Sequence, residues 1–217
     1  AWNEAQRRCS EWDYYLLLND DTVLYESVIE ELLLTEEYCI KTYGRNGLVS
    51  GLCHDSENHS AITYGGEVFV NKFLGRYAKA VPSESPMLID MCNANILLVP
   101  QATVNQIGIF YEGYNHAYAD YDYSLKARQQ KIPVLLTAKI CGSCTDDHDD
   151  RQSERRKVCQ MSYKQRKEYY RNPLHSNKDY LTFIKRNIPV KFPFTCLFRT
   201  MNVLCPKLYY LCDSIRR

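Results

Sequence analysis

The chain has 217 residues, of which 45% are hydrophobic and 24% are charged, which is ordinary for a globular protein with one substantial core. Its net charge of +1 is too small for overall charge to indicate a partner. Because no apolar run reaches the roughly 18 to 20 residues of a membrane-spanning helix, we expect no transmembrane segment.

The charge is divided unevenly along the chain. Residues 151–217 contain 16 Lys or Arg against four Asp or Glu, a net of +12, which leaves −11 for residues 1–150 because the whole chain carries +1. An acidic first part suits a site made of carboxylates and a cation, whereas a basic tail suits an anionic surface such as lipid headgroups. The ten cysteines lie within apolar runs, so we expect reduced, buried thiols.

The chain begins with a helix, a strand and a second helix. Residues 1–5 resemble the middle of a helix, so we expect further residues upstream. Residues 11–18 end in an apolar run typical of a strand covered on both faces, and this strand stops at Asn19-Asp20-Asp21-Thr22. Helical spacing follows at once, with one apolar stripe made of Val23, Val28, Ile29, Leu32 and Leu33.

The middle of the chain alternates between strands and helices. Residues 48–53 predict a short strand, and residues 61–70 predict a hairpin around Gly65-Gly66. Residues 86–99 contain a strand interrupted by Asn93-Ala94-Asn95. A helix then opens at Pro100 and runs through Ile107.

The remaining elements complete the alternation. An irregular aromatic stretch at 110–118 precedes a helix at 120–130 and a strand at 133–136. Beyond residue 150 the pattern is helical and basic. This order predicts an α/β fold with a mixed sheet flanked by helices, in which residues 1–150 form one domain and residues 151–217 a basic helical extension.

Two pairs of polar residues are candidates for chemistry. Asn19 and Asp21 follow a buried strand, at the sheet edge where open α/β proteins bind ligands, and their oxygens suit Mg²⁺ or Mn²⁺. Asp21 could instead simply cap the next helix. Asp120 and Asp122 open a helix, where one carboxylate can act as a base while the other caps the amides. The alternative is that both are solvated acids favoured by the helix dipole.

Asn93 and Asn95 form a third candidate group, inside an otherwise apolar strand. Small and amide side chains would let a ligand approach and would offer it hydrogen bonds. A bulge or a turn explains the same residues nearly as well.

These features occur in the order and spacing of the family 2 glycosyltransferases of the GT-A fold, which the chain resembles. Residues 14–22 (YYLLLNDDT) resemble the strand and metal motif of that family, and residues 62–66 (ITYGG) and 93–100 (NANILLVP) look like its acceptor-side segments. Residues 107–112 (IGIFYE) followed by 120–128 (DYDYSLKAR) are similar to its Gly-x-Phe-Asp-Glu and Glu-Asp-x-Asp-x-x-x-Arg block. The resemblance covers about the first two thirds of the chain and is closest to the rhamnosyltransferase-like, polysaccharide-biosynthesis type.

The resemblance implies a GT-A-like, Rossmann-like mixed sheet and an inverting, metal-dependent transfer of a sugar. The donor would be a nucleotide-diphosphate sugar, and the acceptor a glycan or lipid-linked sugar in cell-surface polysaccharide biosynthesis. It implies that Asp21, with Asn19, binds Mg²⁺ or Mn²⁺ and that Asp120 is the catalytic base. The substrate-binding residues that it implies are Asn93, Asn95, Glu112, Tyr114, His116 and Asp122.

The chain departs from the family pattern in three places. Ala119 stands where the family has a Glu before the catalytic Asp, and His148, in a polar run, is no clean counterpart of the family's His after the last strand. The family also places its nucleotide-binding half before the metal strand, so we expect on the order of 60 to 90 residues to be missing here.

Two other classes of function remain as alternatives. Ala119 and the missing front half favour a non-catalytic glycan-binding or scaffold protein that keeps the fold. The basic tail also suits nucleic acid, but no nucleic-acid-binding motif is present, so we expect no such partner. We expect a cytoplasmic protein whose tail either lies on the anionic inner face of a membrane or packs as a solvated helical extension.

Overall fold

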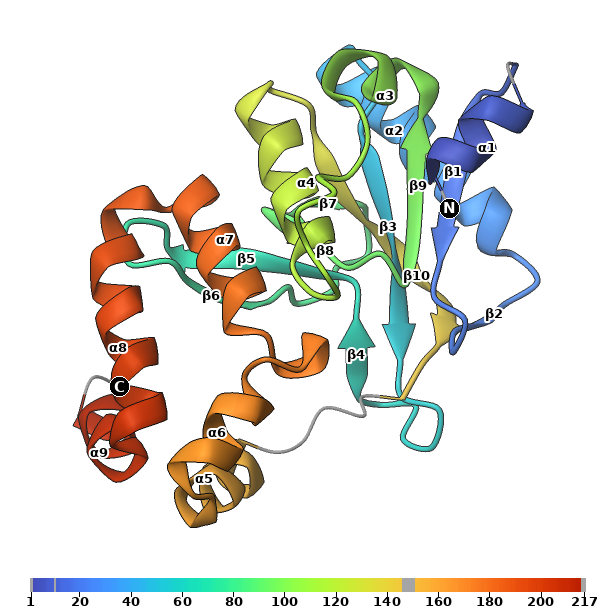
Figure 1. Ribbon diagram of the computed structural model, residues 1–217. Helices are drawn as coiled ribbons and strands as arrows, with labels where there is room; N and C mark the ends of the chain where they lie inside the picture. Colours follow the sequence, from blue (N-terminus) through green and yellow to red (C-terminus); the bar gives the residue numbers. More distant parts are fainter. Residues whose placement is uncertain (1, 10, 146–150, 216–217) are drawn as a thin grey trace. The chain divides into compact units, whose positions relative to one another are not determined.

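The computed structural model describes residues 2–9, 11–145 and 151–215. It is a mixed α/β protein with a mixed sheet flanked by helices, as predicted, with 46% of residues in helices and 23% in strands (Figure 1). The chain divides into two compact units. The first comprises Ala1–Lys72, Arg76–Tyr111 and Asp120–Asp146, and the second comprises Phe73–Gly75, Glu112–Ala119 and Asp147–Arg217.

A seven-stranded sheet forms the centre of the first unit. Five strands follow one another across it in the order β1 (Tyr14–Leu18), β9 (Ile96–Pro100), β3 (Leu48–His54), β10 (Val134–Ser143) and β2 (Val23–Leu24). In addition, β4 (Ile62–Tyr64) pairs with β3, and β7 (Met87–Leu88) pairs with β10. Because β9 is antiparallel to β1 and to β3, while β3 and β10 are parallel, the carboxyl ends of β1, β3 and β10 share one edge (Figure 1).

Alternate side chains of β9 explain why helices cover both faces of the sheet. Leu97 and Val99 pack in one core cluster with residues of α3 (Gln101–Ile107) and α4 (Ala119–Gln129), and Trp2 of α1 (Trp2–Arg8) packs against that cluster. Ile96 and Leu98 pack on the other face with residues of α2 (Val28–Tyr43). Successive side chains of a strand point to opposite faces, so a fully apolar strand requires cover on both.

The helix α2 begins at Val28, later than the apolar stripe predicts. Val23 instead lies in β2, which pairs with Gly142 and Ser143 of β10. The predicted stripe was also wrong about the buried face, because Ile29 is 50% exposed whereas Glu31 is only 8% exposed. The buried positions of the helix are Val28, Glu31, Leu32, Thr35, Glu36 and Cys39.

The predicted hairpin at residues 61–70 is wrong. The segment before Gly65 is β4, which pairs with β3, whereas the segment after it is β5 (Gly66–Asn71), which belongs to a separate sheet with β6 (Arg76–Lys79) and β8 (Met91–Cys92). Gly65 has a φ of 153°, and a Cβ there would lie 2.8 Å from Leu136 Cδ1. The glycine therefore lets the chain pass from one sheet to the other.

The strand β10 is longer than predicted and irregular in its middle. Its ten residues face the seven of β3, with Val134 opposite Leu48 and Ser143 opposite His54, so β10 contains three residues more than its partner. Register shifts between Leu136 and Gly142 absorb these residues as a bulge.

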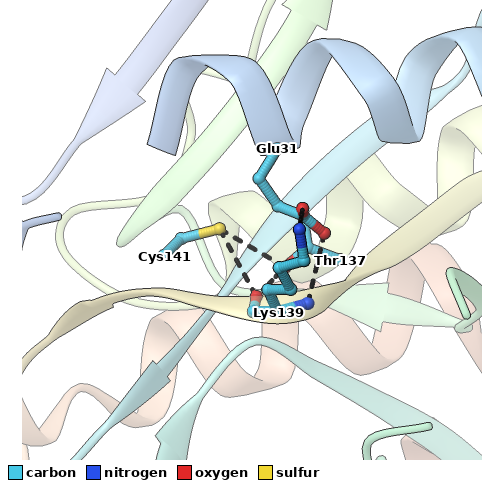
Figure 2. Close-up of polar contacts among 4 residues, drawn as sticks. All are labelled: Glu31, Thr137, Lys139 and Cys141. Carbon is cyan, nitrogen blue, oxygen red and sulfur yellow. Dashed lines mark hydrogen bonds and ion pairs between the residues drawn. The ribbon is translucent and has the colours of Figure 1, made fainter. Parts of the chain in front are cut away.

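Side chains satisfy the backbone groups that this bulge displaces. The Thr137 hydroxyl accepts a hydrogen bond from the Leu52 amide (3.0 Å) and donates one to the Lys139 carbonyl (2.9 Å). Glu31 of α2 accepts the Lys139 amide (3.2 Å) and pairs with the Lys139 ammonium (3.5 Å), while Cys141 lies beside Thr137 (Figure 2). A hydroxyl and a carboxylate thus replace the ladder partners that regular pairing would supply.

The second unit is helical, as the pattern beyond residue 150 predicts. Its helices are α5 (Arg151–Gln160), α6 (Tyr163–Tyr169), α7 (Asn177–Asn187), α8 (Phe192–Leu204) and α9 (Pro206–Ile215), with short 3₁₀ turns at Pro173–His175 and Pro189–Lys191. Ser162 and Gln165 form a capping box at the start of α6. None of the helices within the described ranges is long and apolar enough to cross a membrane. All ten cysteines are free thiols, as expected, but only five of them are buried, all in the first unit. The expectation of buried thiols was wrong for the other five, of which Cys9 and Cys205 are exposed.

Candidate active site

The candidate metal-binding residues lie in the turn that follows β1. The apolar strand ends at Leu18, and Asn19, Asp20 and Asp21 are exposed. The Asn19 amide donates to the Asn95 carbonyl (3.2 Å). The Thr22 amide donates to the Asn19 carbonyl (3.3 Å), which closes the turn from Asn19 to Thr22. Backbone hydrogen bonds therefore fix this acidic turn beside the segment that precedes β9.

Asn95 also connects this turn to the end of β10. Its side chain is 5% exposed, and its Nδ2 donates to the sulfur of the fully buried Cys144 (3.4 Å). The side chains of Thr22 and Asp21 lie beside the same thiol. Burial raises the pKa of Cys144, and the Asp21 carboxylate raises it further. The thiol therefore remains protonated at neutral pH and acts as a neutral polar neighbour of Asp21.

Asp120, the predicted base, lies in the first turn of α4. Its Oδ2 accepts a hydrogen bond from the Ala94 amide (3.2 Å), and its Oδ1 accepts one from the Tyr121 amide (2.8 Å). Burial raises the pKa of Asp120 above its ordinary value, although these two amides partly oppose the shift. A carboxylate with a raised pKa is a stronger proton acceptor than an exposed one, as general-base catalysis requires.

A second polar network is centred on the side chain of Tyr121, the residue that follows Asp120. The Tyr121 hydroxyl donates to Glu67 Oε1 (3.4 Å) and accepts from Asn93 Nδ2 (3.3 Å), while Asn93 Oδ1 accepts the Gly65 amide (3.3 Å). Glu67 is 8% exposed, and burial raises the pKa of its carboxyl, against the Tyr121 hydrogen bond and the Lys79 charge. This network fixes Asn93 and the start of α4 relative to each other.

The segment Asn93-Ala94-Asn95 therefore brings the two predicted catalytic elements together. Its Ala94 amide contacts Asp120, while the carbonyl and side chain of Asn95 contact the acidic turn and Cys144. All of these residues belong to the first unit. Asp120 and the acidic turn thus contact the same short segment, which directly precedes β9.

Among the residues that the structure describes, the acidic turn lacks the ligands for a metal site made of protein groups alone, but it suits a cation that is also bound by the substrate. Within the described ranges, no group of three or more His, Cys, Asp or Glu residues lies close enough together to hold a metal. Mg²⁺ commonly takes one or two protein carboxylates and completes its shell with substrate phosphates and water. One carboxylate, Asp21, with the amide oxygen of Asn19 suits a cation that is shared with a diphosphate.

Three of the predicted substrate-binding residues, Glu112, Tyr114 and His116, lie in the second unit. Their loop is held by Asp179 of α7, a fully buried residue whose carboxylate accepts the backbone amides of the loop. The donors are the amides of Asn115 (3.1 Å), His116 (2.9 Å) and Ala117 (3.2 Å) and the side chain of Asn115 (3.0 Å).

Asp122 is 3% exposed, so its carboxylate lies inside the first unit rather than on the surface of α4. His148 lies outside the described residues.

Sequence reasoning missed two residues near the candidate site, His54 and Glu67. His54 ends β3, where its Nε2 and the Tyr25 hydroxyl form a hydrogen bond and its ring lies 4.4 Å from that of His59. The Cys144 amide also donates to the His54 carbonyl (3.0 Å). The available signal was a histidine directly after an apolar strand. Glu67 gave no comparable signal, because it looks like any exposed strand residue.

No protein-family model matches the chain, and no curated protein is significantly similar to it in sequence. Any function assigned to the chain therefore depends on the residues described above.

Proposed function

We propose that this protein is a glycosyltransferase that transfers a sugar from a nucleotide-diphosphate sugar to a hydroxyl group of a glycan or lipid-linked acceptor. The observation that carries the proposal is the contact of Asn93-Ala94-Asn95 with both the acidic turn and Asp120. A single displacement at a sugar carbon needs a base for the acceptor and stabilisation of the departing diphosphate. Asp120 suits the first role and Asp21 the second.

In this mechanism Asp120 takes the proton of the acceptor hydroxyl while the acceptor oxygen attacks the anomeric carbon. The bond between that carbon and the diphosphate oxygen breaks, the nucleoside diphosphate leaves, and the configuration inverts. Asp21, with Asn19, would hold Mg²⁺ or Mn²⁺, which supplies positive charge to the diphosphate. The Asn93 side chain hydrogen-bonds to Tyr121, which follows Asp120 in the chain. The Asn95 side chain hydrogen-bonds to Cys144, which lies beside Asp21.

The resemblance to family 2 glycosyltransferases supports the same proposal. On that basis we also propose a GT-A-like arrangement of the sheet and a role in the biosynthesis of cell-surface polysaccharides. The mixed sheet with helices on both faces is compatible with this finer assignment.

The test measures the release of nucleoside diphosphate from a panel of sugar nucleotides, with Mn²⁺ or with a chelator. We expect Asp120→Asn to lower kcat by about 10²- to 10⁴-fold, the usual contribution of a general base. Asp21→Asn should abolish the stimulation by Mn²⁺. The matched control is Asp20→Asn, because Asp20 is an exposed neighbour in the same turn.

Three results would contradict the proposal. Unchanged kcat in Asp120→Asn would exclude this residue as the base, and equal loss in Asp20→Asn and Asp21→Asn would exclude a specific metal ligand. Glycan binding by the folded protein without turnover of any donor would favour the non-catalytic alternative.

A further inference from the structure

Helix α8 buries two polar side chains and leaves several large apolar ones exposed. Its buried residues are the polar Thr195, at 6% exposure, and Asn202, at 2%. Asn202 donates to the Tyr170 hydroxyl (2.7 Å), and Thr195 donates to the Lys191 carbonyl (2.9 Å). The contact with Tyr170 shows that Asn202 faces the interior of the unit, whereas the Thr195 bond is local to the start of the helix.

Three large apolar side chains of α8, by contrast, are exposed, while others such as Phe198 and Val203 are half-buried. Leu197 is 64% exposed, Phe194 63% and Leu204 54%, and Val190 in the preceding 3₁₀ turn is 64% exposed. Their spacing of three, four and seven residues places them along one side of the helix, and we call these four residues the apolar stripe. Leu208 and Leu211 of α9 are also at least half exposed, at 50% and 55%. Contiguous exposed apolar side chains mark an interaction surface rather than an ordinary solvated face.

The charge of the same segment indicates what binds there. Between Tyr180 and Cys212 the sequence contains no Asp or Glu, whereas it contains the exposed Lys185, Arg186 and Lys207 and the half-buried Lys191. A fifth cation, Arg199, instead lies over the ring of Tyr180 (4.3 Å). A second copy of the chain would bring the exposed cations together, so charge opposes self-association through this surface. An anionic lipid surface offers negative headgroups for the cations and an apolar layer for the stripe.

We infer that α8 and α9 bind the surface of a membrane that contains anionic lipids. The apolar stripe enters the boundary between headgroups and acyl chains, and the exposed cations, such as Lys207, lie against the headgroups. The helices lie in the membrane surface, since no helix of the described ranges is long and apolar enough to cross it. This inference is independent of the proposed glycosyl transfer, although it would bring a lipid-linked acceptor to the protein.

The first test is co-sedimentation of the protein with vesicles of phosphatidylcholine alone or mixed with phosphatidylserine. We expect binding only to the mixed vesicles, and release at high salt because headgroup attraction is screened. Leu197→Gln should lower the partition coefficient about tenfold, since it removes one buried leucine from the lipid. The matched control is Leu174→Gln, because Leu174 in the Pro173–His175 turn of the same unit is equally exposed, at 63%.

The second test reports where the stripe lies and does not depend on loss of binding. Leu197→Trp should gain fluorescence quenching by brominated lipid relative to the unsubstituted protein, whose Trp2 and Trp12 lie in the first unit. Leu174→Trp should gain none. The inference is overturned if the protein ignores anionic vesicles, if Leu197→Gln binds as well as Leu174→Gln, or if the two added tryptophans are quenched equally. Concentration-dependent dimerisation that Leu197→Gln abolishes would overturn it as well, in favour of a second copy.

Discussion

Replacing Asp179 with alanine should destabilise the second unit and loosen the loop that contains Glu112, Tyr114 and His116. The Asp179 carboxylate is fully buried and accepts three backbone amides and one side-chain amide of this loop. Hydrogen bonds to a charged group contribute roughly 1.5–3 kcal/mol each, but they are not additive within one network. We therefore expect Asp179→Ala to lower the free energy of unfolding by about 3–5 kcal/mol, and Asp179→Asn by about 2 kcal/mol.

Hydrogen exchange measures the local part of this effect. If about 3 kcal/mol of local stability is lost, the amides of Asn115, His116 and Ala117 should exchange roughly a hundredfold faster. The control is Glu168→Ala, which removes an exposed acid of α6 in the same unit. Equal unfolding curves for Asp179→Ala and Glu168→Ala, with unchanged exchange at Asn115 to Ala117, would refute the reasoning.

The same carboxylate predicts a dependence of stability on pH. Burial alone would raise the pKa of Asp179, but the amides of His116, Ala117 and Asn115 hold it below its usual value. A lowered pKa in the folded state means that the stabilisation is complete above the ordinary carboxyl pKa of about 3.9 and is lost as the pH falls through the folded value. The stability difference between the protein and Asp179→Asn should therefore shrink below about pH 4.

Two further substitutions test buried polar groups of the first unit by urea unfolding. Thr137→Val should lower the free energy of unfolding by about 1–3 kcal/mol, because the Leu52 amide loses its acceptor. The control is Thr35→Val, since the buried Thr35 hydroxyl has no hydrogen-bond partner among the described residues. Equal effects of the two substitutions would contradict the role of Thr137. Burial raises the pKa of Glu36, against the hydrogen bonds from Asn46 and the Gly47 amide, so the protein should lose stability relative to Glu36→Gln as the pH rises from 4 towards 7. A pH-independent difference would contradict that reasoning.

Much of the fold follows from local sequence patterns. The apolar runs that became β1 and β3, and the helix α4 behind its two acids, are found where the sequence predicts them. These elements depend on hydrophobic periodicity and on turn residues, which are properties of neighbouring residues. The mixed α/β class follows from their order.

The errors occur where distant residues decide the structure. β2 is two residues long and exists because Gly142 and Ser143 pair with it, more than a hundred positions along the chain. Gly65 carries a strong local turn signal, but the segments on its two sides pair in different sheets. Sequence patterns contain no information on such partners.

The candidate site shows the same division. Asp21 and Asp120 were recognisable because each stands at the end of a periodic segment. Glu67 and His54 became visible only when the structure placed them next to Tyr121 and Tyr25, respectively. Short polar contacts between separate elements are set by packing, so the surroundings of a predicted residue are harder to derive than the residue itself.

The bulge of β10 has a consequence for how this chain tolerates changes in length. Before the bulge, Leu135 and Leu136 pair with β7, and after it Gly142 and Ser143 pair with β2. Both short strands lie along the edge of β10 that does not pair with β3. Deleting or inserting one residue between these pairs would turn one half of the strand to the wrong face of the sheet. The spacing between the two neighbours is therefore fixed, and designed insertions belong in exposed loops such as the one around Glu57.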